Sequence, residues 1–295
     1  MAQLYDGKYE FVEEIGKGGF GRVFKAEERI TERHVAIKEL HDKAERKQKY
    51  IIRELKTIAQ FQRERVVAYF NHFHHEGKLF LVMEYCPNGN LKKYYKQKNI
   101  PGGAVNNVIK GVAKELYFIH SKNVIHRDIK PANLLVSESN MVKIADFGIA
   151  NTLGGTPPYM SPEALQGDIR SMQDPRVDIY SLGVTMMELL TGKNPFYYLS
   201  ADQILALHEK GDFPINDLPQ WQQEVILKAI HKEPELRFQT MKEFAEAIRA
   251  KHAPFILNQD MLKAGEIAAS AEKLLGHKKW IKAIGLLDHG ENQYP

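Results

Sequence analysis

The sequence HRDIKPAN occupies residues 126–133, and DFG follows at residues 146–148. Both segments flank short apolar runs that predict strands at 133–136 and 141–145, so their polar side chains can converge. The converging groups are Asp128, Lys130, Asn133 and Asp146. Two carboxylates with an amide and a lysine suit a site that holds Mg²⁺ against phosphates and accepts a hydroxyl proton.

A glycine-rich segment lies upstream, where Gly16, Gly18 and Gly21 are spaced as G-x-G-x-x-G. This spacing alone is a weak signal, and a tight hairpin turn is the simplest alternative. The segment stands between two predicted strands, whereas the dinucleotide-binding fingerprint joins a strand to a helix, so that function is disfavoured. A glycine hairpin can instead lay its backbone N–H groups over phosphates without obstruction by side chains.

Lys38 ends the segment VAIK (35–38), in which the other residues are apolar. The alternative to a functional role is a surface lysine whose stem covers apolar neighbours. Glu54 favours function, because it borders the apolar stripe of a predicted helix that includes Ile51 and Ile58. An inward-facing carboxylate is costly unless it is paired, so we expect Lys38 and Glu54 to form an ion pair.

The order of the predicted elements divides the chain into two lobes. Up to about residue 84, short β-branched and aromatic runs predict strands, with one helix between the third and the fourth. The predicted strands are residues 9–16, 22–28, 34–40, 66–73 and 79–86. Helices dominate from residue 90 onward, and the most apolar of them, 179–190, is too short to span a bilayer and is interpreted as a buried helix. The expected fold is α+β, with a β-rich N-lobe at 5–84 and an α-rich C-lobe at 85–253.

Bulk composition narrows the classes of function. The chain has 295 residues, of which 43% are hydrophobic and 26% charged, and a net charge of +4, which suits one or two domains. The densest basic run, LKKYYKQK at 91–98, is interpreted as a solvated helix face, and nucleic-acid binding is not expected. Cys86 is the single cysteine, so neither an internal disulfide nor a cysteine zinc site is expected. With no signal-peptide pattern, we expect a cytoplasmic protein that does not associate with a membrane.

Taken together, these motifs resemble the eukaryotic-type protein kinase family over about residues 5–250. The resemblance implies ATP as phosphoryl donor, Mg²⁺ as cofactor and proteins as substrates. It implies that Asp128 is the catalytic base and that Lys130 steadies the γ-phosphate. It also implies that Asn133 and Asp146 bind Mg²⁺.

The same resemblance assigns the nucleotide pocket and two structural contacts. Lys38, positioned by Glu54, would hold the α- and β-phosphates beneath the glycine-rich hairpin. The other implied ATP-binding residues are Ile15, Gly16, Gly18, Gly21, Val23, Ala36, Met83, Glu84, Cys86 and Leu135. Asp178 would anchor the catalytic loop, and Glu163 would pair with Arg237.

The implied acceptors are serine and threonine hydroxyls, because Lys130 and the segment GTPPYMSPE at 155–163 resemble the serine/threonine branch. Relatives that prefer basic substrates often carry Glu near Asn90 and at Ala132. Neither position is acidic here, so a preference for upstream arginine is not supported. Two rival functions are a pseudokinase scaffold, against which the intact catalytic motifs weigh, and a small-molecule kinase, which GTPPYMSPE disfavours.

The segment between Gly148 and Gly155 is short, since its six residues fully extended reach on the order of 20 Å. Family members have a longer segment at this place, which brings a phosphorylated residue to the arginine beside the catalytic aspartate. In this chain that arginine is Arg127. Either the segment is short by nature, with Thr152 as its free hydroxyl, or the natural segment is longer than the one in this sequence; we favour the second. Thr156 is the other regulatory candidate, although its hydroxyl is expected to hold the catalytic aspartate and lysine.

From about residue 258 the chain leaves the kinase pattern. Ala271, Ala283 and Gly290 fall at spacings that resemble the close-packing positions of a tetratricopeptide repeat, so a helical tail is expected at 258–295. The alternative is a plain amphipathic extension packed on the C-lobe. A single repeat cannot bury its own face, so the tail is a possible site for a protein partner.

Overall fold

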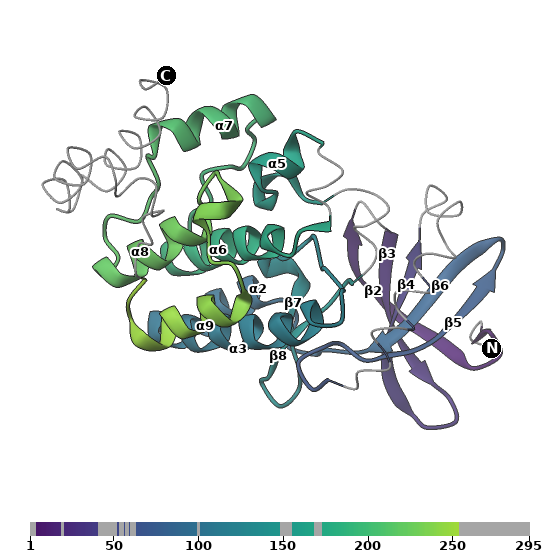
Figure 1. Ribbon diagram of the computed structural model, residues 1–295. Coiled ribbons are helices and arrows are strands. Elements are labelled where there is room, and N and C mark those ends of the chain that lie inside the picture. Colours follow the sequence, from purple (N-terminus) through teal and green to yellow (C-terminus); the bar gives the residue numbers. More distant parts are fainter. Residues whose placement is uncertain are drawn as a thin grey trace, which may run out of the picture.

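The computed structural model of the chain describes residues 4–18, 21–40, 52, 56, 59, 63–98, 101–147, 155–167 and 173–253. As Figure 1 shows, a β-sheet forms one end of the molecule and a group of helices forms the other. The strands of the sheet precede the helices of the other end along the chain, apart from one short strand pair among the helices. This α+β arrangement in two lobes confirms the predicted fold class.

The N-lobe sheet is antiparallel throughout, with the strand order β1-β2-β3-β4-β6-β5. Its strands are β1 (Leu4–Tyr5), β2 (Tyr9–Gly18), β3 (Gly21–Glu28), β4 (Arg33–Leu40), β5 (Tyr69–His75) and β6 (Lys78–Glu84). The five predicted strands are β2 to β6. The sequence pattern did not reveal β1, because a two-residue strand is too short to carry an alternating pattern.

The register of the sheet gathers several predicted nucleotide-binding residues on one face. Val23 lies opposite Lys38, Ala36 lies opposite Met83, and Gly16 lies opposite Val23. Residues opposite each other share a face of a sheet, and so do residues two positions apart on one strand. The pleat therefore directs all of these side chains to the same side.

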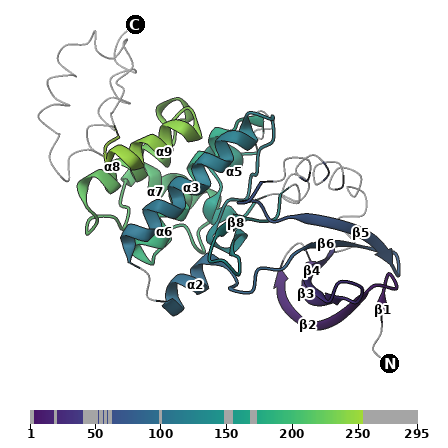
Figure 2. The same ribbon diagram turned by 90° about the horizontal axis from the view of Figure 1, so that it is seen from below.

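The other face of the sheet carries the hydrophobic core of the N-lobe. Val35, Ile37 and Val82 are fully buried there, and the rings of Phe73 and Phe80 stack with centroids 5.0 Å apart. Figure 2 shows the strongly curved sheet from below. Val35 and Ile37 alternate along β4 with Ala36 and Lys38 of the cavity face, and a slip of one residue would exchange the two faces.

The C-lobe is built around a buried helix. Its helices are α2 (Leu91–Lys98), α3 (Gly102–His120), α5 (Pro162–Leu165), α6 (Arg176–Thr191), α7 (Ala201–Lys210), α8 (Gln220–Ala229) and α9 (Met241–Ala250), with 3-10 turns η2 (Pro131–Asn133), η3 (Pro157–Tyr159) and η5 (Pro234–Leu236). Every residue of α6 from 177 to 188 is buried, which confirms the predicted core helix. None of the described helices has both the length and the apolar composition needed to cross a lipid bilayer.

Local sequence signals define the ends of these helices. α6 ends at Gly192, whose φ of 72° is left-handed and therefore suits glycine. α7 begins with a capping box in which the Ser200 side chain accepts a hydrogen bond from the backbone N–H of Gln203. The side-chain oxygen of Gln203 in turn accepts from the backbone N–H of Ser200. These signals stop α6 and start α7 within a short connection.

A buried ion pair ties α5 to the 3-10 turn η5. Arg237 is 2% exposed, and its guanidinium donates two hydrogen bonds to the carboxylate of Glu163, at 2.8 and 2.7 Å. Its remaining donors reach the carbonyl oxygens of His231 and Lys232 at 2.7 and 2.9 Å. The predicted pairing of Glu163 with Arg237 is confirmed, and the cost of burying the guanidinium is offset because its donors are satisfied.

His208 on α7 makes the stability of the C-lobe sensitive to pH. Burial and the charge of nearby Arg237 lower the pKa of His208 to about 4, and the Tyr180 hydroxyl donates to its neutral Nε2 at 2.8 Å. The unfolded chain takes up this proton near pH 6.5 and the folded one only near pH 4. Stability is therefore full above about pH 6.5 and is lost as pH falls, by about 2 kcal/mol between pH 7 and pH 5.

We expect urea midpoints of the wild type to fall across this range and His208→Phe to remove most of that slope. The phenyl ring keeps the packing against Phe196 and Phe213. The variant loses the hydrogen bond from Tyr180, at a cost of about 1–3 kcal/mol at pH 7. An unchanged slope in the variant would contradict this role of His208.

Candidate functional site

A short hairpin in the C-lobe brings the two catalytic segments together. Strand β7 (Leu134–Val136) pairs antiparallel with β8 (Val142–Ile144), and Leu134 lies opposite Ile144. The backbone N–H of Ala145 donates to the carbonyl of Asn133 at 2.8 Å. Asn133, which precedes β7, therefore lies beside the residues that follow β8. This brings Asn133 next to Asp146, as the sequence predicted.

Asp128 is the centre of a dense hydrogen-bond cluster. Its Oδ1 accepts from the backbone N–H of Thr156 at 3.0 Å and from the Thr156 hydroxyl at 2.7 Å. Its Oδ2 accepts from Lys130 Nζ at 2.7 Å and from Asn133 Nδ2 at 2.8 Å. Lys130 also donates to the Thr156 hydroxyl. The contacts of Thr156 with both Asp128 and Lys130 are thereby confirmed.

The loop that carries Asp128 is anchored from the buried helix. Asp178 on α6 accepts from the backbone N–H groups of His126 and Arg127 at 2.8 and 2.7 Å, and from the ring of His120 at 2.8 Å. Burial opposes the ionisation of Asp178, but the hydrogen bond and charge of His120 and the contacts with His126 outweigh it and lower its pKa. The predicted anchoring role of Asp178 is confirmed.

Two non-glycine residues at the site have left-handed backbones. Arg127 and Asp146 both have a φ of 66°, a conformation that the surrounding structure must hold in place. His126 helps to do so, since its Nε2 contacts the carbonyl oxygen of Ala145 at 2.8 Å and its Nδ1 accepts from the N–H of Asp128 at 3.2 Å. These partners require the neutral tautomer with the proton on Nε2.

Close approach of two backbones explains why Gly155 precedes Thr156. A Cβ at Gly155 would lie 2.9 Å from the carbonyl oxygen of Arg127, and a real Cβ does not come so near. The contact lets the chain run directly alongside the catalytic loop. It thereby places Thr156 within hydrogen-bond distance of Asp128.

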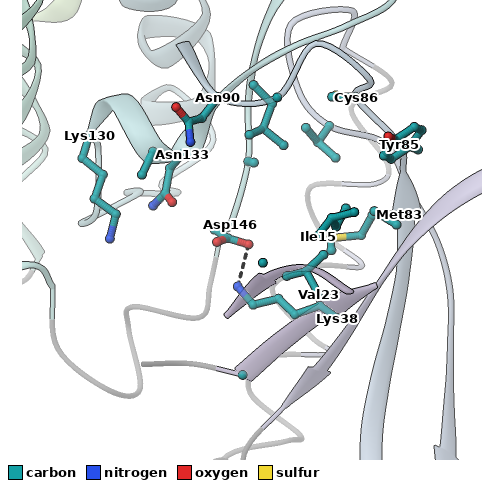
Figure 3. Close-up of a pocket in the computed structure, with 18 of the residues that line it drawn as sticks. Ile15, Val23, Lys38, Met83, Tyr85, Cys86, Asn90, Lys130, Asn133 and Asp146 are labelled. Carbon is teal, nitrogen blue, oxygen red and sulfur yellow. Dashed lines mark ion pairs between the residues drawn. The ribbon is translucent and has the colours of Figure 1, made fainter. Parts of the chain in front are cut away.

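Lys38 pairs with Asp146 across the two lobes. Lys38 is 4% exposed, and its Nζ lies 2.8 Å from Asp146 Oδ1 (Figure 3). Burial raises the pKa of Asp146, but the charge and hydrogen bond of Lys38, with the charge of Lys130, hold it below its usual value. Glu54, the partner predicted for Lys38, lies outside the described residues, so that pairing stays a prediction.

A cavity of about 920 Å³ lies between the sheet and the catalytic hairpin, with Lys38, Asp146 and Asn133 in its wall (Figure 3). The predicted ATP-binding residues that line it are Ile15, Gly16, Gly21, Val23, Ala36, Lys38, Met83, Glu84, Cys86 and Leu135. The place predicted for Gly18 in this pocket stays a prediction. Gly21 is required by the hairpin itself, because its φ is 148° and a Cβ there would lie 1.8 Å from the carbonyl oxygen of Glu39.

An ion pair beside the cavity holds the end of β6, where the chain leaves the N-lobe sheet. Glu84 pairs with Lys143 at 2.7 Å, and its carboxylate accepts from the N–H of Ala68 at 3.2 Å. Cys86, two residues further, is buried, and burial raises the pKa of its thiol to about 12. A thiol in that state is a poor nucleophile.

The four lysines of the basic run on α2 are exposed, as the sequence predicted, but one of them also contacts a buried carboxylate. Lys92 Nζ lies 2.6 Å from Oε1 of Glu188, whose side chain is 3% exposed on the buried helix α6. The hydroxyl of Tyr159 also donates to Glu188, and it lies 2.7 Å from the hydroxyl of Tyr197. Burial and the bond to Glu188 raise the pKa of Tyr159 above its usual value. A contact over 96 positions leaves no trace in local sequence pattern.

Asn133 and Asp146 could hold a divalent cation. Both N–H groups of the Asn133 amide are directed at Asp128, one to its carbonyl and one to Oδ2, so the amide oxygen remains as the acceptor. Mg²⁺ is usually held by one or two protein oxygens together with substrate phosphates. Among the described residues, no three or more carboxylates, histidines or cysteines gather into an all-protein metal site. The donor set therefore fits a cation that binds together with a nucleotide.

The fold and the site define a class of protein. A cavity between two lobes, a glycine hairpin, a buried lysine–aspartate pair and an aspartate hydrogen-bonded to a lysine and an asparagine are typical of a nucleotide-dependent phosphotransferase. The chain belongs to the protein kinase family, since the family described as "Protein kinase domain" matches residues 9–255. ATP and Mg²⁺ are the phosphoryl donor and the cofactor of this family.

Curated relatives of the chain include kinases from distant organisms. It is 34% identical to serine/threonine-protein kinase pak-1 of Caenorhabditis elegans over 72% of this chain and 39% of that one. It is 29% identical to serine/threonine-protein kinase PrkC of Bacillus subtilis over 97% and 47%, and 34% identical to an Aurora kinase of Schizosaccharomyces pombe over 67% and 58%. The chain thus spans less than two thirds of the length of each of these relatives.

Proposed function

We propose that this chain transfers the γ-phosphoryl group of ATP to serine and threonine hydroxyls of proteins. The observation that carries the proposal is the cluster around Asp128, where the catalytic loop and the segment beginning at Thr156 meet on one carboxylate. Asp128 is buried, and it borders the cavity residues Lys130 and Asn133. A hydroxyl brought to this point has a proton acceptor and a phosphate-binding lysine within reach.

Asp128 acts as the base for the acceptor hydroxyl. Its two oxygens receive four hydrogen bonds, and an ionised carboxylate offers about four lone-pair sites. An incoming hydroxyl must therefore replace one of the present donors. Lys130 is the donor best able to leave, because its Nζ ends a flexible stem and is attracted to the γ-phosphate of bound ATP. Its departure opens a lone pair on Oδ2 for the hydroxyl proton.

Lys38 and Asp146 exchange partners when the nucleotide binds. In their mutual ion pair each group satisfies the charge of the other. Lys38, positioned by Glu54, would then turn to the α- and β-phosphates, and Asp146 and the amide oxygen of Asn133 would hold the cation. Bound Mg²⁺ neutralises the charge of the phosphates. The chain's own contribution is to hold these groups in place before the reaction.

The adenine ring lies between apolar walls. Val23 and Ala36 cover it from the sheet, and Leu135 lies below it on β7. Ile15 is 41% exposed at the edge of the cavity, an exposed apolar surface that a bound base would cover. The backbone from Met83 to Cys86, including Glu84, offers hydrogen-bonding groups to the edge of the base.

The remaining assignments extend this proposal. The two lobes are residues 5–84 and 85–253, and the tail at 258–295 is a tetratricopeptide-like extension that would bind a protein partner. Arg127 and Thr156 are the regulatory candidates within the described residues. The tail and Thr152, with the short segment that contains it, lie outside the described residues. The alignment with the Bacillus subtilis relative runs over 308 residues, whereas this chain has 295. Within the matched region, that relative therefore has residues that this chain lacks.

A phosphoryl-transfer assay with radiolabelled ATP tests the proposal. We expect label in serine and threonine, not tyrosine, of a mixed protein substrate, and loss of the label when EDTA removes Mg²⁺. The matched control is Asp128→Asn, which has nearly the same size and keeps one oxygen to accept from Thr156. Equal labelling by the wild type and Asp128→Asn would contradict the role of Asp128.

A further inference from the structure

The cavity wall carries more positive than negative side chains. Its lysines are Lys17, Lys38, Lys93 and Lys130, and its carboxylates are Glu84 and Asp146. Both carboxylates are engaged within the chain, Glu84 by Lys143 and Asp146 by Lys38, each with a nitrogen within 2.8 Å. Among the described residues of this wall, a positively charged substrate side chain would therefore find no uncommitted carboxylate.

Lys93 lies where the cavity meets the first turn of α2. Asn90 and Lys93 line the same cavity as Thr156 and Pro157, so one continuous space joins the start of α2 to the residues beside Asp128. The side chain of Lys93 is exposed and forms no ion pair with any residue that the structure describes. Its backbone N–H bonds to the side-chain oxygen of Asn90 at 3.0 Å, which fixes this turn at the cavity mouth.

The surface around Lys93 is basic along α2, and the buried carboxylate beneath it is paired with a lysine. α2 carries four lysines and no acidic residue. Glu188, beneath the segment that contains Tyr159, is paired with Lys92 and hydrogen-bonded to Tyr159. This buried carboxylate is thus satisfied by a cation of its own chain.

We propose that Lys93 selects serine and threonine acceptors that are flanked by acidic side chains; this inference rests on the proposed protein kinase function. A glutamate or aspartate close to the acceptor in the substrate chain would meet the ammonium of Lys93 at the cavity mouth. The charge of Lys93 then favours acidic substrate segments and disfavours basic ones. Lys93 acts on recognition and takes no part in the transfer itself.

The test uses three peptides with one serine acceptor and the same length, flanked on both sides by Glu, Gln or Arg. We expect the wild type to have the highest kcat/KM for the Glu peptide and the lowest for the Arg peptide. Lys93→Glu should lower the ratio of kcat/KM for the Glu peptide over the Gln peptide about fivefold to tenfold, since reversing one exposed charge changes a pair worth up to about 1 kcal/mol into a repulsion. Lys98→Glu is the matched control, because it makes the same charge change on the same helix away from the cavity, and the ratio should stay within about twofold.

The outcomes separate the two proposals. If the wild type phosphorylates the Glu and Gln peptides equally well, the acidic preference is wrong although the kinase function stands. A preference that Lys98→Glu lowers as much as Lys93→Glu would show general charge attraction and would overturn the role of Lys93, as would a raised KM for ATP with an unchanged peptide ratio. If no protein or peptide is phosphorylated at all, the proposed function falls, and the inference falls with it.

Discussion

Replacing Lys38 with methionine is expected to lower kcat/KM for phosphoryl transfer by about a thousandfold or more while the chain stays folded. Methionine keeps the length and the unbranched stem of lysine and removes its charge. The lost ammonium is a fixed charge that meets the phosphates in a site where catalysis consists of positioning and electrostatic stabilisation, and single groups of this kind contribute about 10²- to 10³-fold or more.

The same substitution leaves Asp146 without its ion-pair partner, which sets the expected change in stability. The side chain of Asp146 is 26% exposed to the cavity, so water can solvate the carboxylate after Lys38 is removed. Its pKa should rise toward the ordinary range, because Lys38 is the main group that lowers it. We therefore expect Tm to fall by only a few degrees, a loss on the order of 1 kcal/mol.

The matched control is Lys143→Met. Lys143 is also an ion-paired lysine, 2.7 Å from Glu84 and with a side chain 15% exposed, but it is not among the residues that line the cavity. We expect this variant to keep most of its activity. An unchanged kcat/KM in Lys38→Met at an unchanged Tm would refute the assignment of Lys38, and an equal loss in both variants would show that the effect is structural.

The core of the candidate site could be predicted because local structure brings it together. A hairpin of two three-residue strands is enough to place Asn133 beside Asp146. The register of the sheet likewise follows from alternation, so Val23, Ala36 and Lys38 share a face without reference to the rest of the fold. A contact between strands and turns that are neighbours in the chain can therefore be predicted from the local sequence.

Contacts between distant elements could not be predicted in the same way. The structure pairs Lys38 with Asp146, a contact that the sequence did not indicate, and that pairing depends on how the two lobes meet. The lysines of α2 looked alike in sequence, yet Lys92 contacts a buried carboxylate and Lys93 faces the cavity. Which face of a polar helix turns inward is decided by its packing partners, and no periodicity in LKKYYKQK reports them.

Replacing Asp178 with alanine is expected to destabilise the folded chain by about 3–5 kcal/mol and to abolish phosphoryl transfer. Asp178 is fully buried and accepts three hydrogen bonds, two of them from the backbone of His126 and Arg127. Its removal leaves those N–H groups without an acceptor, at about 1–3 kcal/mol each, and leaves His120 without its carboxylate partner. Because the pKa of Asp178 is lowered on folding, its contribution is present above about pH 4 and is lost as pH falls further.

Activity should fail in this variant even under conditions where it remains folded. Arg127 has a left-handed backbone, and the backbone N–H groups of both His126 and Arg127 in this loop donate to Asp178. Without it the loop can relax, and a shift of Asp128 by about 1 Å is enough to cost on the order of 100-fold in rate.

Asp174→Ala is the control, because Asp174 precedes the same helix, pairs with Arg176 at 2.7 Å and has no contact with the catalytic loop. Removing that pair should cost about 1 kcal/mol or less and leave kcat unchanged, since Arg176 keeps Glu235 as a partner at 3.2 Å. Urea unfolding of both variants, followed by kcat measured at 10 °C where both are folded, separates the two effects. An Asp178→Ala variant with full kcat at that temperature would mean that the catalytic loop holds its conformation without the buried carboxylate.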